Sequence, residues 1–130
     1  MAQPLKAVAD VARMPLDHRK LDVYRRALTL LELCDAIVKH LPAGRARLKE
    51  QLDDAAGSVV ANIAEGAGEF SRKEKARFYR MARRSAIEIA AWFEITERRG
   101  EAPAPLVQRA LSELEVIVAM LVKLIQTCER

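Results

Sequence analysis

The stretch that decides the fold is SRKEKARFYRMARRSAIEIAAWFEITERRG, residues 71–100. It opens with Ser71 and Glu74 at the spacing of a capping box, in which a hydroxyl and a carboxylate bond the free N–H groups of a helix start. Arg99 and Gly100 mark its end. We therefore predict one long helix here. Its predicted inner face recurs at three- and four-residue spacing and consists of Phe78, Met81, Ala82, Ser85, Ile89, Trp92 and Ile95.

Two further helices are predicted ahead of this stretch. The first runs from Asp22, a suitable N-cap, to about His40, and Pro42 with Gly44 ends it. The second spans about residues 45–65, and Gly66-Ala67-Gly68 stops it. Each carries one apolar stripe at helical spacing. The members are Val23, Ala27, Leu30, Leu31, Cys34, Ile37, Val38 and Leu41, followed by Leu48, Leu52, Ala55, Val59 and Ile63.

A fourth helix is predicted from Pro105, a favourable first helical residue, to about Cys128. Four helices with short connections fold back on one another as antiparallel neighbours. The predicted fold is therefore all-α, an antiparallel up-down-up-down four-helix bundle over residues 21–130. Residues 1–20 have weak periodicity and contain Pro4 and Pro15, so we expect a mobile or loosely docked N-terminal arm there.

Composition limits the class of protein. The chain has 130 residues, of which 51% are hydrophobic and 31% charged, and its formal net charge is +4. That mixture is typical of one globular domain. The two cysteines are far apart and are expected to be reduced thiols in apolar surroundings. The sequence shows no secretory signal and no apolar run long enough for a membrane span, so we expect a cytoplasmic protein with no membrane partner.

The last predicted helix carries more apolar surface than one subunit needs. Seven consecutive apolar residues, 116–122, cover every side of a helix. A broad inner face is already filled by Val107, Ala110, Leu111, Leu114, Ile117, Val118, Leu121 and Ile125. The surplus side chains, which point away from that face, predict self-association, although scattered exposed apolar residues are also ordinary. The predicted oligomer interface consists of Val116, Ala119 and Met120.

Positive charge is concentrated in the third predicted helix. Residues 71–99 hold nine basic and four acidic residues, so they carry the whole excess. Lys73, Arg77, Arg80 and Arg84, the basic stripe, fall within roughly 60° of arc and span about 16 Å. Such a row suits a phosphate backbone, and no aromatic residue within it supports base stacking. We therefore predict RNA or DNA contact; the alternatives are a solvated charged face or ion pairs between subunits.

The patterns of common catalytic and metal sites are absent from the sequence. His18 and His40 are the only histidines, and neither lies in a Glu-x-x-His pair or near a cysteine at zinc spacing. No phosphate-binding Gly-Lys-Ser/Thr loop and no Gly-x-Ser-x-Gly elbow is present. Ser85 and Glu88 share a helix face without an evident base and orienting group. We expect no enzyme activity, no cofactor and no metal.

Three polar residues of the second predicted helix, Ser58, Asn62 and Glu65, also share a face. A hairpin turning around residues 66–70 would bring Glu65 near Arg72 and Ser58 near Phe78 and Tyr79. We expect these groups to fix the register of a close helix contact. The alternative is a ligand or ion site built on Asn62 and Glu65.

The segment SVVANIAEGAG, residues 58–68, resembles a known family. It fits the pattern Ser-[IV]-x-x-Asn-Ile-Ala-Glu-Gly-x-Gly of small four-helix-bundle proteins encoded by intervening sequences of bacterial large-subunit ribosomal RNA genes. The third predicted helix fits the family's Phe-x-x-x-Ala-x-x-Ser-x-x-Glu spacing. The resemblance covers about residues 20–100. Its motif residues, for which it implies a structural role, are Ser58, Asn62, Glu65, Gly66, Ser85 and Glu88.

The resemblance also implies assembly. Members of this family look like ring-shaped homo-oligomers, often pentamers, and no catalytic residues are assigned to them. A distantly similar group, the accessory variability proteins of retroelements, binds nucleic acid and a reverse transcriptase through a basic surface. We thus expect a non-enzymatic homo-oligomer with a basic surface for RNA or DNA. The alternative is a structural or protein-interaction oligomer whose basic stripe makes subunit contacts.

Overall fold

The computed structural model describes residues 18, 19 and 21–130. Four helices make up the fold: α2 (Asp22–Val38), α3 (Ala46–Gly68), α4 (Arg72–Arg99) and α5 (Ala104–Cys128). The predicted N-terminal arm lies outside the described residues except for His18 and Arg19. The His18 ring meets the edge of the Tyr24 ring, with centroids 4.7 Å apart, at the start of α2.

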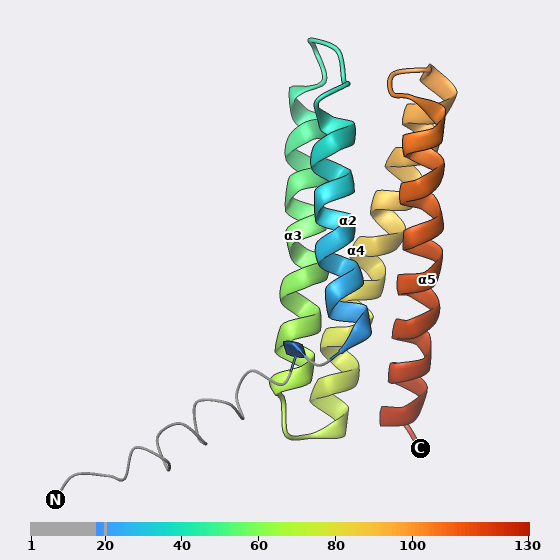
Figure 1. Cartoon of the computed structure of the whole chain (residues 1–130). Coiled ribbons are helices and arrows are strands. Elements are labelled where there is room, and N and C mark those ends of the chain that lie inside the picture. The colour runs from blue at the N-terminus through green and yellow to red at the C-terminus, as the bar shows by residue number, and fades with distance from the viewer. Residues whose placement is uncertain (1–17, 20) are drawn as a thin grey trace, which may run out of the picture.

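The helices form the predicted bundle. Successive helices run in opposite directions, and each packs against its neighbours in the order α2, α3, α4, α5 and back to α2 (Figure 1). Two turns close the end at the top of the view, and the α3–α4 turn lies at the lower end together with the C-terminus (Figure 1). No strand occurs in residues 21–130, so the all-α prediction is confirmed.

The predicted core faces of three helices are largely correct. All five predicted residues of α3 are buried, as are Ala27, Leu30 and Ile37 on α2. On α5 five of the eight predicted residues are buried. The other three, Leu111, Val118 and Ile125, are half-buried at the edge of the same face. Together the helices bury about two dozen hydrophobic side chains, the scale expected of a folded domain of this length.

The predicted core face of α4 is wrong in part: Ala82 and Ile89 are buried, but the other five predicted residues are not. Met81 and Ile95 are 38% and 36% exposed, and Phe78, Ser85 and Trp92 are only half-buried. The buried face is rotated by about one residue and consists of Ala76, Tyr79, Ala82, Ala86, Ile89, Phe93 and Thr96. The small side chains on this face allow α3 and α5 to approach closely. Thr96 is buried because its hydroxyl donates to the carbonyl oxygen of Trp92 at 2.9 Å.

Two helix ends also differ from the predictions. Asp22 is not the N-cap of α2: Leu21 holds that position without a side-chain hydrogen bond, and Asp22 pairs with Arg25 at 2.9 Å instead. Helix α3 continues through the predicted stop to Gly68. Lys75 on α4 supports this last turn by donating to the carbonyl oxygens of Gly66 and Ala67 at 3.2 and 2.9 Å, the first of which also accepts from the Glu69 backbone N–H.

The start and end of α4 follow the predicted signals. The Ser71 hydroxyl accepts from the Glu74 backbone N–H at 3.0 Å, which is one half of the capping box. The Glu74 carboxylate accepts from Arg77 at 3.0 Å. Gly100 ends the helix with φ at 65°, a left-handed conformation that glycine adopts without strain.

Candidate functional site

The basic stripe lies on the outer side of α4. Lys73, Arg77, Arg80 and Arg84 are all exposed. Because the true core face is rotated relative to the predicted one, the stripe stands roughly 160° from it around the helix, and not a third of a turn away. All four cations therefore point directly away from the bundle.

Two of the four cations have acidic partners. Arg77 pairs with Glu74 at 3.0 Å, and its guanidinium also lies over the Phe78 ring, 4.5 Å from the centroid. Arg80 pairs with Glu129, next to the C-terminus. Within the described part of the chain, no acidic side chain lies within ion-pair distance of Lys73 or Arg84. The stripe is thus only partly neutralised.

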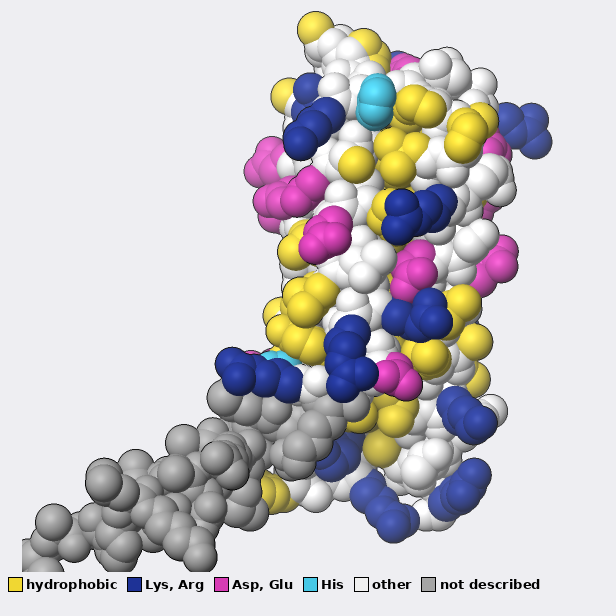
Figure 2. Space-filling model, in the orientation of Figure 1, with side chains coloured by type: hydrophobic (Ala, Val, Ile, Leu, Met, Phe, Trp, Pro, Cys, Tyr) yellow, Lys and Arg dark blue, Asp and Glu magenta, His cyan; other side chains and the backbone are white. Residues whose placement is uncertain are grey.

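The surrounding surface adds to the positive charge. Arg72 and Arg83 are also exposed on α4, and the Arg72 guanidinium reaches the backbone oxygen of Arg130 at 3.5 Å. From 72 to 84 the helix has seven basic residues and one acidic residue, Glu74. The face made by α2 and α5 differs: Figure 2 shows acidic, basic and hydrophobic side chains intermingled there, with basic ones gathered at the lower end. The charge on this part of α4 is therefore more nearly of one sign than that on the face made by α2 and α5.

The polar family-motif residues meet at the α3–α4 contact. The hydroxyls of Ser58 and Ser85 lie 2.9 Å apart. Asn62 donates to the Ser58 carbonyl oxygen at 2.9 Å and to its hydroxyl at 3.0 Å. The expectation that Ser58 would lie near Phe78 and Tyr79 is wrong. Helix α3 continues to Gly68, so the chain turns later than predicted and Ser58 lies opposite Ser85.

A small polar cleft opens beside this contact. It has a volume of about 430 Å³ and is lined from α3 by Ser58 and Asn62. Its α4 side is lined by Met81, Arg84, Ser85 and Glu88. Arg84, the last cation of the stripe, therefore connects the stripe with the motif residues. Glu65 is exposed and does not line this cleft, so the structure does not join Asn62 and Glu65 in one site.

Gly66 is the motif residue with the tightest packing. Its Cα faces the Tyr79 ring on α4, and a β-carbon there would lie 2.6 Å from Cε1. Tyr79 is buried, and burial raises the pKa of its hydroxyl. Together with the Lys75 bonds, this close approach holds the end of α3 against the first turns of α4, where the basic stripe begins.

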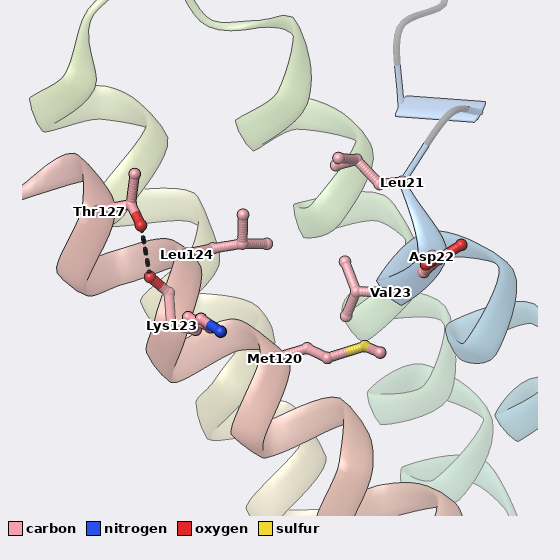
Figure 3. A pocket seen from close by; sticks show the side chains of 7 residues that line it. All are labelled: Leu21, Asp22, Val23, Met120, Lys123, Leu124 and Thr127. Atoms are coloured by element: carbon pink, nitrogen blue, oxygen red, sulfur yellow. Dashed lines mark hydrogen bonds between the residues drawn. The ribbon is translucent and has the colours of Figure 1, made fainter.

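The three predicted interface residues are neighbours on α5 but differ in exposure and surroundings. Val116 and Met120 are half-buried and Ala119 is exposed. Met120 lines a pocket of about 330 Å³ between the start of α2 and the end of α5, where it reaches toward Val23 (Figure 3). Ala119 instead lines a groove of about 760 Å³ between α4 and α5, together with Ile87.

Several large hydrophobic side chains are exposed outside that prediction. Leu28, Met81, Ile87 and Ile95 are 36–44% exposed, whereas Phe70 in the α3–α4 turn is 101% exposed. Sequence reasoning missed Phe70. The available signal was an aromatic residue in a turn, where polar residues and glycine are usual.

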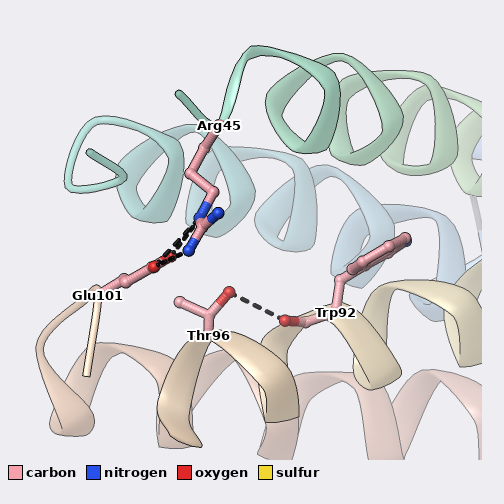
Figure 4. A network of polar contacts seen from close by, with 4 residues as sticks. All are labelled: Arg45, Trp92, Thr96 and Glu101. Atoms are coloured by element: carbon pink, nitrogen blue, oxygen red, sulfur yellow. Dashed lines mark hydrogen bonds and ion pairs between the residues drawn. The ribbon is translucent and has the colours of Figure 1, made fainter. Parts of the chain in front are cut away.

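The opposite end of the bundle is held by an ion pair. Arg45, before α3, donates to both carboxylate oxygens of Glu101, before α5, through Nε at 3.0 and 3.1 Å (Figure 4). This bidentate contact raises the pKa of Arg45 and lowers the pKa of Glu101. It ties together the two turns farthest from the start of the basic stripe.

The described residues offer few groups for metal binding or nucleophilic catalysis. Among the described residues, no three His, Cys, Asp or Glu side chains are grouped to hold a metal ion. Burial raises the pKa of the Cys34 thiol to about 12, which suppresses its nucleophilic thiolate form. None of the four described helices combines the length and apolarity that a membrane span requires.

These features define an antiparallel four-helix bundle with a cationic outer face on one helix and a polar motif beside it. The family model described as 23S rRNA-intervening sequence protein matches residues 19–123. The chain therefore belongs to that family. Its description refers to an intervening sequence of 23S rRNA and names no substrate, partner or reaction. No curated protein matches the chain.

Proposed function

We propose that this protein is a non-enzymatic, cytoplasmic homo-oligomer that binds RNA or DNA through the outer face of α4. The observation that carries the proposal is the orientation of the basic stripe. Its four cations point away from the core, and two of them, Lys73 and Arg84, have no acidic partner in the described part of the chain. A phosphate backbone supplies the negative charge that such a row attracts.

Self-association would strengthen this binding. The half-exposed hydrophobic side chains on α4 and α5, Ile87 and Ile95 among them, support contact between copies. A ring, with five subunits as in the resemblance, would present several stripes to one strand. Several weak contacts on one particle bind more tightly than any one of them alone.

The second candidate is an oligomer in which the basic stripe serves subunit contacts. The groove between α4 and α5 favours it, because Glu94, Glu97 and Glu115 line that groove and would attract the cations of a neighbouring copy. In that case the stripe would be covered in the assembly. The natural partner would then be another protein or only the chain itself.

A titration with labelled RNA and DNA separates these candidates. With about four phosphate contacts, affinity is expected to fall roughly 50- to 150-fold between 50 and 200 mM salt. The variant Arg77→Glu with Arg80→Glu is expected to abolish binding while the particle mass stays unchanged. Arg47→Glu with Arg109→Glu is the matched control, since both residues are exposed and lie outside the stripe.

Two results would contradict the proposal. If the stripe variant dissociates the oligomer in light scattering, the stripe is a subunit contact and the second candidate is correct. If the wild type scatters as a single 14.6 kDa chain, the homo-oligomer is wrong. Nucleic-acid binding would then rest on one stripe alone.

A further inference from the structure

Phe70 is the most exposed large hydrophobic residue in the described part of the chain. Its side chain is 101% exposed, whereas the next, Ile87, is 44% exposed. A buried phenylalanine contributes to folding by leaving water, and the fully exposed Phe70 gains no such contribution from the described helices. Its conformation is set by the turn between Glu69, which caps α3, and Ser71, which caps α4.

The residues that follow Phe70 along the chain are cationic, whereas the residue before it, Glu69, is acidic and half-buried. Arg72 and Lys73 follow it directly, both exposed, at the end of α4 where the basic stripe begins. The N-terminus of α4 adds the positive end of a helix dipole. On the other side Gly68 is exposed and has no side chain to extend an apolar patch. Phe70 is therefore a fully exposed aromatic ring at the start of a row of cations.

This combination fits a nucleobase better than a protein surface. The core of a protein interface needs a contiguous apolar area, whereas the residues on either side of Phe70 in the chain, Glu69 and Ser71, are polar. A nucleobase needs only one flat face, and proteins that bind single strands pair such aromatic platforms with a positive track for the phosphates. The bases of a duplex are already stacked on one another and cannot use the ring.

We propose that Phe70 is a stacking platform for an unpaired base, which makes single-stranded nucleic acid the substrate class of the basic stripe. This inference rests on the proposed function. The base stacks on Phe70, and the phosphates that follow it along the strand lie on Lys73, Arg77 and Arg80. Because stacking uses the face of the base, the platform accepts any sequence and either sugar.

The test compares a 20-nucleotide single strand with its own duplex, using the full-length protein. Phe70→Ala is expected to weaken single-strand binding roughly tenfold, the size of one base–aromatic stack, and to leave duplex binding unchanged. Leu28→Ala is the matched control, since Leu28 is also an exposed hydrophobic residue, on α2. It is expected to change neither affinity.

A spectroscopic variant reports the contact directly. Phe70→Trp places an indole at the platform, and its fluorescence is expected to fall when a single strand binds but not when the duplex binds. The wild type, with Trp92 as its one tryptophan, gives the background signal. Since the Phe70 side chain is fully exposed on the described part of the bundle, both variants are expected to fold with unchanged melting temperatures.

Each contrary outcome has a separate meaning. If Phe70→Ala weakens single strand and duplex equally, or neither, the stacking platform is wrong while salt-dependent binding through the stripe still stands. If Phe70→Ala lowers the particle mass, Phe70 is a subunit contact and the inference falls. If the wild type binds neither nucleic acid, the inference and the proposed function fail together.

Discussion

Gly66 on α3 and Tyr79 on α4 are packed so closely that a β-carbon on Gly66 would lie 2.6 Å from the Tyr79 ring. The ring is buried, so moving it aside would expose apolar surface to water. This contact sets the distance between the two helices at the end of the bundle where the basic stripe begins. It also gives a physical reason for glycine at this position of the family motif.

Gly66→Ala is therefore expected to lower the free energy of unfolding by about 1–3 kcal/mol, because overpacking strains the helix contact. Denaturant unfolding measures the change. Gly57→Ala is the control: Gly57 lies within the same helix, and a β-carbon there meets no atom within 4 Å. That variant is expected to stabilise the fold by about 0.5–1 kcal/mol through helix propensity. A destabilising effect of Gly57→Ala would indicate that another copy covers this face of α3.

Glu101→Gln is expected to lower the melting temperature at pH 7, since it removes the carboxylate that accepts from Arg45. Arg45 holds the pKa of Glu101 below its usual value of 4.5. The ion pair therefore stabilises the fold above that pH, and the contribution is lost as the pH falls through the lowered pKa. Thermal unfolding of wild type and variant is expected to converge at acid pH. Equal differences at pH 7 and pH 2.5 would contradict this, and Glu50→Gln, an exposed glutamate on α3, is the control.

Glu129→Gln is expected to increase nucleic-acid affinity by about two- to fivefold at low salt, the range of a surface ion pair. Glu129 pairs with Arg80 and so competes with phosphate for one cation of the stripe. Fluorescence anisotropy with labelled RNA measures the change. Glu115→Gln, within α5, changes the charge of the chain equally, but at the α4–α5 groove. If both variants increase affinity to the same extent, the effect is one of net charge and not of Arg80.

Cys34 is expected to resist alkylation in the folded protein. Burial, aided by Asp35 and Asp53, raises the pKa of its thiol to about 12, so very little reactive thiolate exists at pH 8. Cys128 near the chain end is only half-buried. Mass spectrometry after iodoacetamide treatment should show one adduct, on Cys128, in buffer and two adducts in urea. Rapid modification of Cys34 in buffer would show that α2 and α3 separate readily.

The number, type and order of the helices were predictable from local signals. The Ser71 cap, the left-handed Gly100 and the apolar spacing of α3 each act within a few residues of the chain. Such signals need no knowledge of neighbouring helices. The end of α3 was predicted too early. Its last turn is bonded by the Lys75 side chain, which comes from the next helix and so is not a local signal.

The sequence predicted which basic residues make up the candidate site but not which side chains they contact. The four stripe residues follow from helical spacing, and the structure places them all on the outside. Their ion pairs do not follow from spacing alone, because Glu129 reaches Arg80 from the other end of the chain. The Ser58–Ser85 contact similarly depends on how far α3 extends before the chain turns.

By itself, the sequence determined four helices, their antiparallel order and a cationic third helix, since propensity, caps and charge spacing act locally. The tertiary structure alone decided which side of α4 is buried. That helix carries two adjacent apolar faces, one with Met81 and Trp92 and one with Tyr79 and Phe93, and periodicity favours neither. In the bundle the buried face is the one with Tyr79, Phe93 and three alanines, and this orientation turns the basic stripe directly outward.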